Sequence, residues 1–130
     1  MSLHASEYLI QRCTEDARVL HERVATMRRG TRIPGPDAAT SERMADACED
    51  IIELLDDLAS DAAEPLTTAA LLEMLTPHLE ARMKQQAHAA VRAVYAGAIA
   101  RLREMDEVDQ RDATPRDAIE HDASERDVPQ

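Results

Sequence analysis

Residues 44–62 have the sequence MADACEDIIELLDDLASDA, in which apolar side chains and carboxylates recur at a regular spacing. The apolar positions follow one another at steps of four or three residues and are Met44, Cys48, Ile51, Leu55, Leu58 and Ala62. Because an α-helix turns once every ~3.6 residues, this spacing keeps them on one side of a helix. We therefore predict a helix from about Ser41 to Ala62, with Thr40 or Ser41 as its N-cap, that is buried on one side and acidic on the other.

A long helix is also predicted before this one, over residues 3–29. Its apolar side follows a seven-residue repeat with two inward positions, which are Leu3, Ile10, Ala17 and Val24, and Ser6, Cys13, Leu20 and Met27. Gly30 suits the position after the helix end, because glycine adopts positive φ without strain. The same heptads are compatible with a coiled-coil dimer, so a homodimer is an open alternative, but we favour packing within one chain.

A proline marks the predicted start of the last long helix. A short helix is expected over residues 68–75, after the Glu-Pro step at 64–65. Thr76 followed by Pro77 is typical of a helix start, because proline at the first helical position sacrifices no helical hydrogen bond. The helix is predicted to continue to about Met105. Its expected apolar stripe is Leu79, Met83, Ala87, Val91, Val94, Ala98, Leu102 and Met105.

The composition favours helices over strands. The chain has no Phe, no Trp and two Tyr, and it lacks alternating runs of β-branched and aromatic residues. We predict an all-α fold, an up-and-down bundle of three long helices plus one short connecting helix, over residues 1–106. Residues 107–130 are expected to form an acidic tail that is weakly ordered or carries a short helix.

The charge balance restricts the class of partner. The formal net charge is −11 for 130 residues, and residues 36–75 contain eleven carboxylates and one base, Arg43. Such a chain repels nucleic-acid phosphates. No apolar run is long enough to cross a membrane, and no secretory signal is evident, so we expect a cytoplasmic protein. The strong preference for arginine over lysine suggests a bacterial source with a GC-rich genome.

The strongest candidate site lies on the acidic helix. Glu49, Glu53 and Asp56 occur at i, i+4 and i+7, with Asp57 beside them, which places carboxylates along one helical stripe. We predict that these four residues form a docking surface for a protein partner with a basic surface. A stripe of carboxylates also has the oxygen ligands that Mg²⁺ prefers.

In this spacing the acidic stripe resembles half of the motif of all-α nucleotide pyrophosphatases, the MazG-like and dimeric dUTPase-like enzymes. Those enzymes place two acidic pairs on adjacent helices around metal ions, so the resemblance implies a Mg²⁺-dependent nucleotide hydrolase using Glu49, Glu53 and Asp56. The chain departs from the motif because no second Glu-x-x-Glu or Glu-x-x-Asp pair lies within another predicted long helix.

Other catalytic patterns are absent from the sequence. The five histidines form no Glu-x-x-His or His-x-x-x-His pair, so neither a di-iron nor a zinc site is indicated. Cys13 and Cys48 lie in apolar stripes, and we interpret both as reduced core residues rather than nucleophiles. The sequence also lacks a Gly-rich phosphate loop and a Gly-x-Ser-x-Gly motif. We therefore expect no enzymatic activity and no metal or cofactor.

Residues 68–92 offer a third interpretation, a DNA-binding helix-turn-helix with its turn at 76–77. Arg82, Lys84 and Arg92 would then contact bases or phosphates. The acidic net charge disfavours nucleic acid, and pairing with the acidic helix explains the same basic residues. The preferred prediction is a non-enzymatic bacterial interaction protein, such as a small acidic adaptor, chaperone-like factor or regulator, with the hydrolase and the DNA-binding regulator as alternatives.

Overall fold

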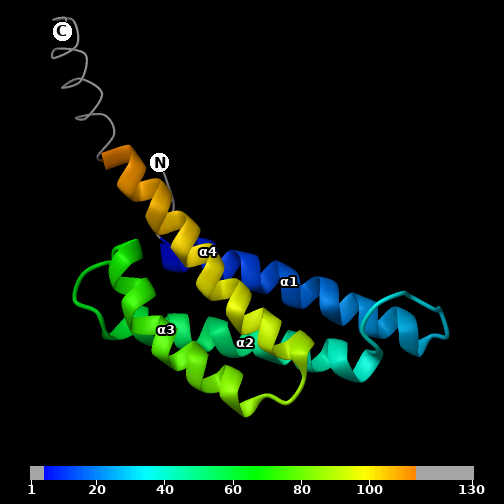
Figure 1. The fold of residues 1–130 in the computed structure, drawn as a ribbon. Helices are drawn as coiled ribbons and strands as arrows, with labels where there is room; N and C mark the ends of the chain where they lie inside the picture. Colours follow the sequence, from blue (N-terminus) through cyan, green and yellow to red (C-terminus); the bar gives the residue numbers. More distant parts are fainter. Residues whose placement is uncertain (1–4, 114–130) are drawn as a thin grey trace, which may run out of the picture.

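The computed structural model describes residues 5–113, which form four α-helices and no strand. The helices are α1 (Ala5–Arg28), α2 (Ala38–Asp61), α3 (Thr68–Gln85) and α4 (Ala89–Ala113) (Figure 1). The predicted all-α class is therefore confirmed. Residues 114–130, to which the expected short tail helix belongs, lie outside the described residues, and α4 continues past the predicted end at Met105.

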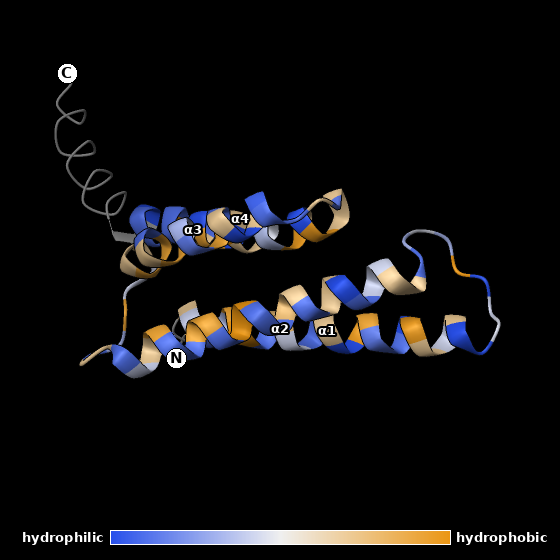
Figure 2. Ribbon diagram, turned by 90° about the horizontal axis from the view of Figure 1, so that it is seen from below, coloured by the Kyte–Doolittle hydropathy of each residue, from blue (hydrophilic) through white to orange (hydrophobic). Residues whose placement is uncertain are grey.

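The four helices are arranged as two layers of two. The helix α1 packs most extensively against α2, and α3 packs most extensively against α4. Figure 2 shows α1 and α2 in one layer and α3 and α4 in the other. Short connections make each pair antiparallel, as expected for neighbouring helices in a bundle. The layers meet mainly through α2 and α4, and α1 contacts α4 much less.

Gly30, two residues after the last residue of α1, ends this helix. Gly30 has a φ of 98°, and its N–H donates to the Met27 carbonyl at 3.0 Å. The Thr31 N–H donates to the Thr26 carbonyl at 3.3 Å. These two bonds satisfy carbonyl groups that the last helical turn leaves free, and they form a Schellman motif. The prediction that Gly30 follows the helix end is confirmed.

The start of α2 differs from the prediction. Asp37 is the N-cap, and its Oδ1 accepts a hydrogen bond from the Thr40 N–H at 2.8 Å. Thr40 and Ser41, which we expected to cap the helix, lie inside its first turns and are buried. Aspartate, serine and threonine cap helices comparably well, so the residue type alone does not decide which of three nearby candidates starts the helix.

The predicted helix start at Thr76 and Pro77 is wrong, because α3 continues through the proline to Gln85. Proline inside a helix removes one backbone hydrogen bond and costs about 3 kcal/mol. The carbonyl that it leaves free is that of Glu73, an exposed residue, so water can satisfy it. Three leucines of α3 at steps of four, two before the proline in sequence and one after it, are completely buried, namely Leu71, Leu75 and Leu79. Burial of these leucines offsets the cost of the proline.

The chain instead breaks at residues 86–88. The Arg92 guanidinium donates to the Gln86 carbonyl at 2.7 Å and to the Ala87 carbonyl at 2.9 Å. Ala87 lies in this break and is exposed, so it does not belong to the apolar stripe that we predicted. After this break, α4 buries Tyr95 and Ile99, which the prediction of one continuous helix did not place in the core.

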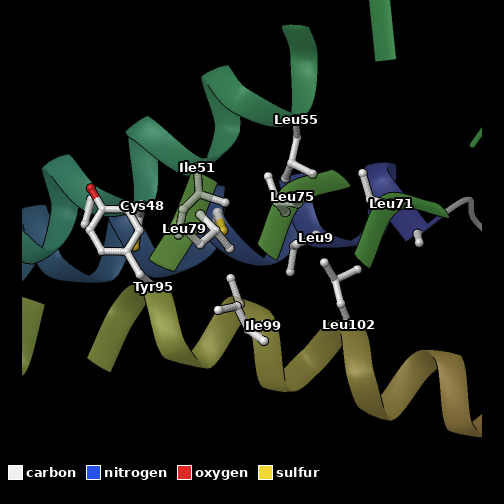
Figure 3. Packing of buried hydrophobic residues seen from close by; sticks show 14 of the residues in the cluster. Leu9, Cys48, Ile51, Leu55, Leu71, Leu75, Leu79, Tyr95, Ile99 and Leu102 are labelled. Atoms are coloured by element: carbon white, nitrogen blue, oxygen red, sulfur yellow. The ribbon is translucent and has the colours of Figure 1, made fainter. Parts of the chain in front are cut away.

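The hydrophobic core lies where all four helices meet (Figure 3). It contains mainly aliphatic side chains, as the composition predicts. The large residues that are completely buried are Leu9, Ile51, Leu55, Leu71, Leu75, Leu79 and Leu102. Each helix contributes at least one of them, so the core holds the two layers together.

Candidate functional site

The predicted docking residues all lie on the side of α2 that faces away from the core. Glu49, Glu53, Asp56 and Asp57 are exposed, whereas Ile51 and Leu55 between them are completely buried. The structure thus places the four carboxylates on one accessible helical surface. Glu49 differs from the other three because it also contacts the neighbouring helix α1.

Part of the acidic side of α2 is bonded to α1. Oε2 of Glu49 lies 3.1 Å from Nε2 of His21, and Oε1 of Glu42 accepts a hydrogen bond from Nη2 of Arg28 at 2.7 Å. These contacts lie along the seam between α1 and α2. Glu49 therefore belongs partly to the packing of the helix pair.

The remaining three carboxylates have no such partner. Within residues 5–113, no hydrogen bond or ion pair involves Glu53, Asp56 or Asp57, and all three are exposed. We call these three residues the unpaired acidic surface. Three like charges within two turns repel one another, and a basic group from another molecule would relieve that repulsion.

The same carboxylates do not form a metal site in this structure. Among the described residues, no group of three or more His, Cys, Asp or Glu side chains is arranged to hold a metal ion. Because α4 is longer than predicted, Glu104 and Glu107 do form a Glu-x-x-Glu pair on a long helix, and both are exposed. That pair joins no metal-binding group either.

Another carboxylate of α2, Asp50, is hydrogen-bonded to both helices of the other layer. Oδ2 of Asp50 accepts a hydrogen bond from Arg82 Nε of α3 at 2.6 Å and another from the Tyr95 hydroxyl of α4 at 2.8 Å. Figure 3 shows the Tyr95 ring beside Cys48 with its hydroxyl toward α2. Burial, followed by the bond to Asp50, raises the pKa of Tyr95 well above its usual range, so the phenol stays a donor.

The three basic residues that were predicted to contact DNA have different environments. Arg82 is bound to Asp50, and Arg92 is bound to the Gln86 and Ala87 carbonyls, so both hold the fold together. Lys84 is exposed near the end of α3. The turn on which the helix-turn-helix interpretation depended does not exist, because α3 is continuous at Thr76 and Pro77.

Both cysteines are buried and free, as predicted for core residues. Burial raises the pKa of the Cys13 thiol to about 11, with the Asp16 carboxylate adding to the shift. Burial likewise raises the pKa of the Cys48 thiol to about 12, with the neighbouring Cys13 contributing. At neutral pH both thiols are therefore protonated and poorly nucleophilic.

Next to these thiols is a groove that sequence reasoning did not find. It has a volume of about 360 Å³ and lies between α1, α2 and α4. Its apolar part is lined by Leu9, Cys13, Val19, Leu20, Met44, Cys48, Ala90, Ala93, Val94, Gly97 and Ala98, and its polar part by Arg12, Asp16 and Arg101. We call it the α1–α4 groove. No sequence signal indicated it, because it depends on how far α4 lies from α1.

Comparison with protein-family models, with curated proteins and with solved structures gives no match to this chain. Among the described helices, none is both long and apolar enough to cross a membrane.

Proposed function

We propose that this protein is a non-enzymatic interaction protein that binds a protein with a basic surface through the unpaired acidic surface. The observation that carries the proposal is a contrast within α2. Glu42, Glu49 and Asp50 each bond to a residue of another helix, whereas Glu53, Asp56 and Asp57 do not. Carboxylates without a bond to any other residue of the part of the chain that the structure describes are available to a partner.

Electrostatic complementarity supports this proposal. Surface charges contribute little to the stability of a monomer, but they steer a partner of opposite charge and fix its orientation. The net charge of −11 extends the attraction to any basic protein that approaches. A bacterial and cytoplasmic setting, and a role as adaptor, chaperone-like factor or regulator, belong to the same proposal.

Charge reversal tests the proposal. We expect a Glu53→Lys, Asp56→Lys, Asp57→Lys variant to lose a stoichiometric partner that the wild type captures from host lysate. The matched control reverses three exposed carboxylates of the other layer, Glu73→Lys, Glu80→Lys and Glu104→Lys, and should keep the partner. Both variants change the net charge equally, so steering by total charge is held constant.

Circular dichroism of both variants checks that the helices are intact. Capture should also weaken as salt is raised, because exposed charges are screened within about 10 Å at 0.1 M salt. Partner capture that survives reversal of the unpaired acidic surface, or that is lost equally in the control, would contradict the proposal.

A further inference from the structure

The α1–α4 groove has the composition of a small-molecule site. Small-molecule pockets typically have volumes of about 300–1,000 Å³ and are mostly apolar with a few polar groups. The groove volume of about 360 Å³ falls in this range. One wall, on α4, includes small residues such as Ala93 and Gly97, and Val19 on the α1 side is 49% exposed. Much of the groove surface is therefore apolar and accessible.

The polar part of the groove contains an unsatisfied donor. Nε of Arg12 is buried, and it is the one buried side-chain nitrogen or oxygen without a hydrogen-bond partner within residues 5–113. A buried donor without an acceptor is unfavourable, so such atoms call for an explanation. Nε itself is closed to solvent, but Arg12 as a whole is only half-buried and lines the groove, so its guanidinium charge is held at the groove wall.

The charges around Arg12 favour an anionic group. Arg101 also lines the groove, and its Nη2 lies 3.9 Å from Oδ2 of Asp16. The groove lining thus holds two guanidinium groups and one carboxylate, which leaves a net positive charge. A guanidinium binds a carboxylate through directed, charge-assisted hydrogen bonds.

We propose that the α1–α4 groove binds an apolar carboxylic acid, with its carboxylate at Arg12 and its hydrocarbon chain along Val94 and Gly97. The buried, protonated thiols of Cys13 and Cys48 contribute apolar surface beneath the chain. The groove volume suits a chain of medium length. This site is separate from the unpaired acidic surface and does not depend on it.

Isothermal titration with dodecanoate, kept below its micelle-forming concentration, tests the proposal. We expect one binding site per chain. Dodecanol, which lacks the charge, should bind roughly tenfold to a hundredfold more weakly, as expected for loss of a charge-assisted hydrogen bond. Dodecylammonium should not bind, since it carries the same sign of charge as Arg12. Equal binding of all three amphiphiles, or no binding of dodecanoate, would overturn the proposal.

Two variants locate the site. Arg12→Gln should weaken dodecanoate to the level of dodecanol, whereas Arg103→Gln, an exposed arginine of α4 outside the groove lining, should leave binding unchanged. Gly97→Leu should abolish binding of both molecules. No side chain or neighbouring helix lies within 4 Å of a Cβ added at Gly97, so the new side chain starts in open space at the groove wall, and circular dichroism checks that the helices stay intact.

Methyl NMR separates specific binding from general adsorption. Dodecanoate should shift the methyl resonance of Met44, which lines the groove, but not that of Met74, which is 41% exposed on α3. Shifts at both methionines would overturn the proposal. So would a dimer of the wild type that Gly97→Leu dissociates, because that result would assign the groove to a second copy of the chain.

Discussion

Asp50 and the three residues of the unpaired acidic surface are all carboxylates of α2, yet their surroundings are opposite. Asp50 lies at the edge of α2 that faces the second layer, and it accepts hydrogen bonds from both α3 and α4. Glu53, Asp56 and Asp57 lie on the exposed side of α2 and contact neither layer through a described polar bond. The comparison shows that position around the helix separates a carboxylate that supports the fold from carboxylates available to a partner.

The largest difference is expected from truncating the two kinds of carboxylate. Asp50→Ala leaves the Arg82 guanidinium and the Tyr95 hydroxyl without their shared acceptor, so we expect the free energy of unfolding to fall by about 1–3 kcal/mol. Asp57→Ala removes an exposed, unpaired charge and should change it by less than about 0.5 kcal/mol. Urea unfolding of both variants measures the difference, and equal losses would refute the distinction.

A smaller effect is expected from the tyrosine that binds Asp50. Tyr95→Phe keeps the buried ring but removes the hydroxyl, and it should lower the free energy of unfolding by about 1 kcal/mol. In the Asp50→Ala background the same change should cost less, because the bond is already lost. A double-mutant cycle by urea unfolding measures this coupling, and fully additive losses would show that the hydrogen bond contributes nothing.

The alkaline pH dependence of stability should depend on the same tyrosine. The folded-state pKa of Tyr95 is raised above the value of about 10 for an unfolded tyrosine, so its stabilising effect is present below pH 10. Stability should decrease as the pH rises further, because the unfolded chain then releases the proton more readily. Unfolding of the wild type and Tyr95→Phe between pH 9 and 11 should show a shallower decrease in the variant.

The raised pKa values of Cys13 and Cys48 act in the same direction from about pH 9 upward. They are present in both proteins, so the comparison isolates Tyr95. An identical pH dependence of the two proteins would contradict the assignment of the tyrosine as a buried donor.

The sequence predicts the layer of α1 and α2 better than the layer of α3 and α4. The spacing of apolar residues in α1 and α2 and the glycine after α1 are local signals, and the packing agrees with them. Thr76 and Pro77 are an equally clear local signal, but burial of Leu71, Leu75 and Leu79 overrides it. Local capping preferences contribute too little free energy to outweigh the burial of several leucines.

For the candidate sites, too, the sequence predicts what depends on one helix but not what depends on how helices pack. That Glu53, Asp56 and Asp57 are exposed follows from the apolar stripe of α2 and could be predicted. That Asp50 would meet Arg82 and Tyr95 could not, because the contact depends on how α3 and α4 cross α2. The α1–α4 groove likewise depends on the separation of two helices that are distant in sequence.

The most direct test of the central distinction is the free energy of unfolding of a Glu53→Gln, Asp56→Asn, Asp57→Asn variant. Because these charges repel one another and have no partner in the described fold, we predict that neutralising them leaves stability unchanged or raises it by up to about 0.5 kcal/mol. A loss of stability as large as that of Asp50→Ala would show that these carboxylates support the fold, and it would contradict their assignment as a partner-binding surface.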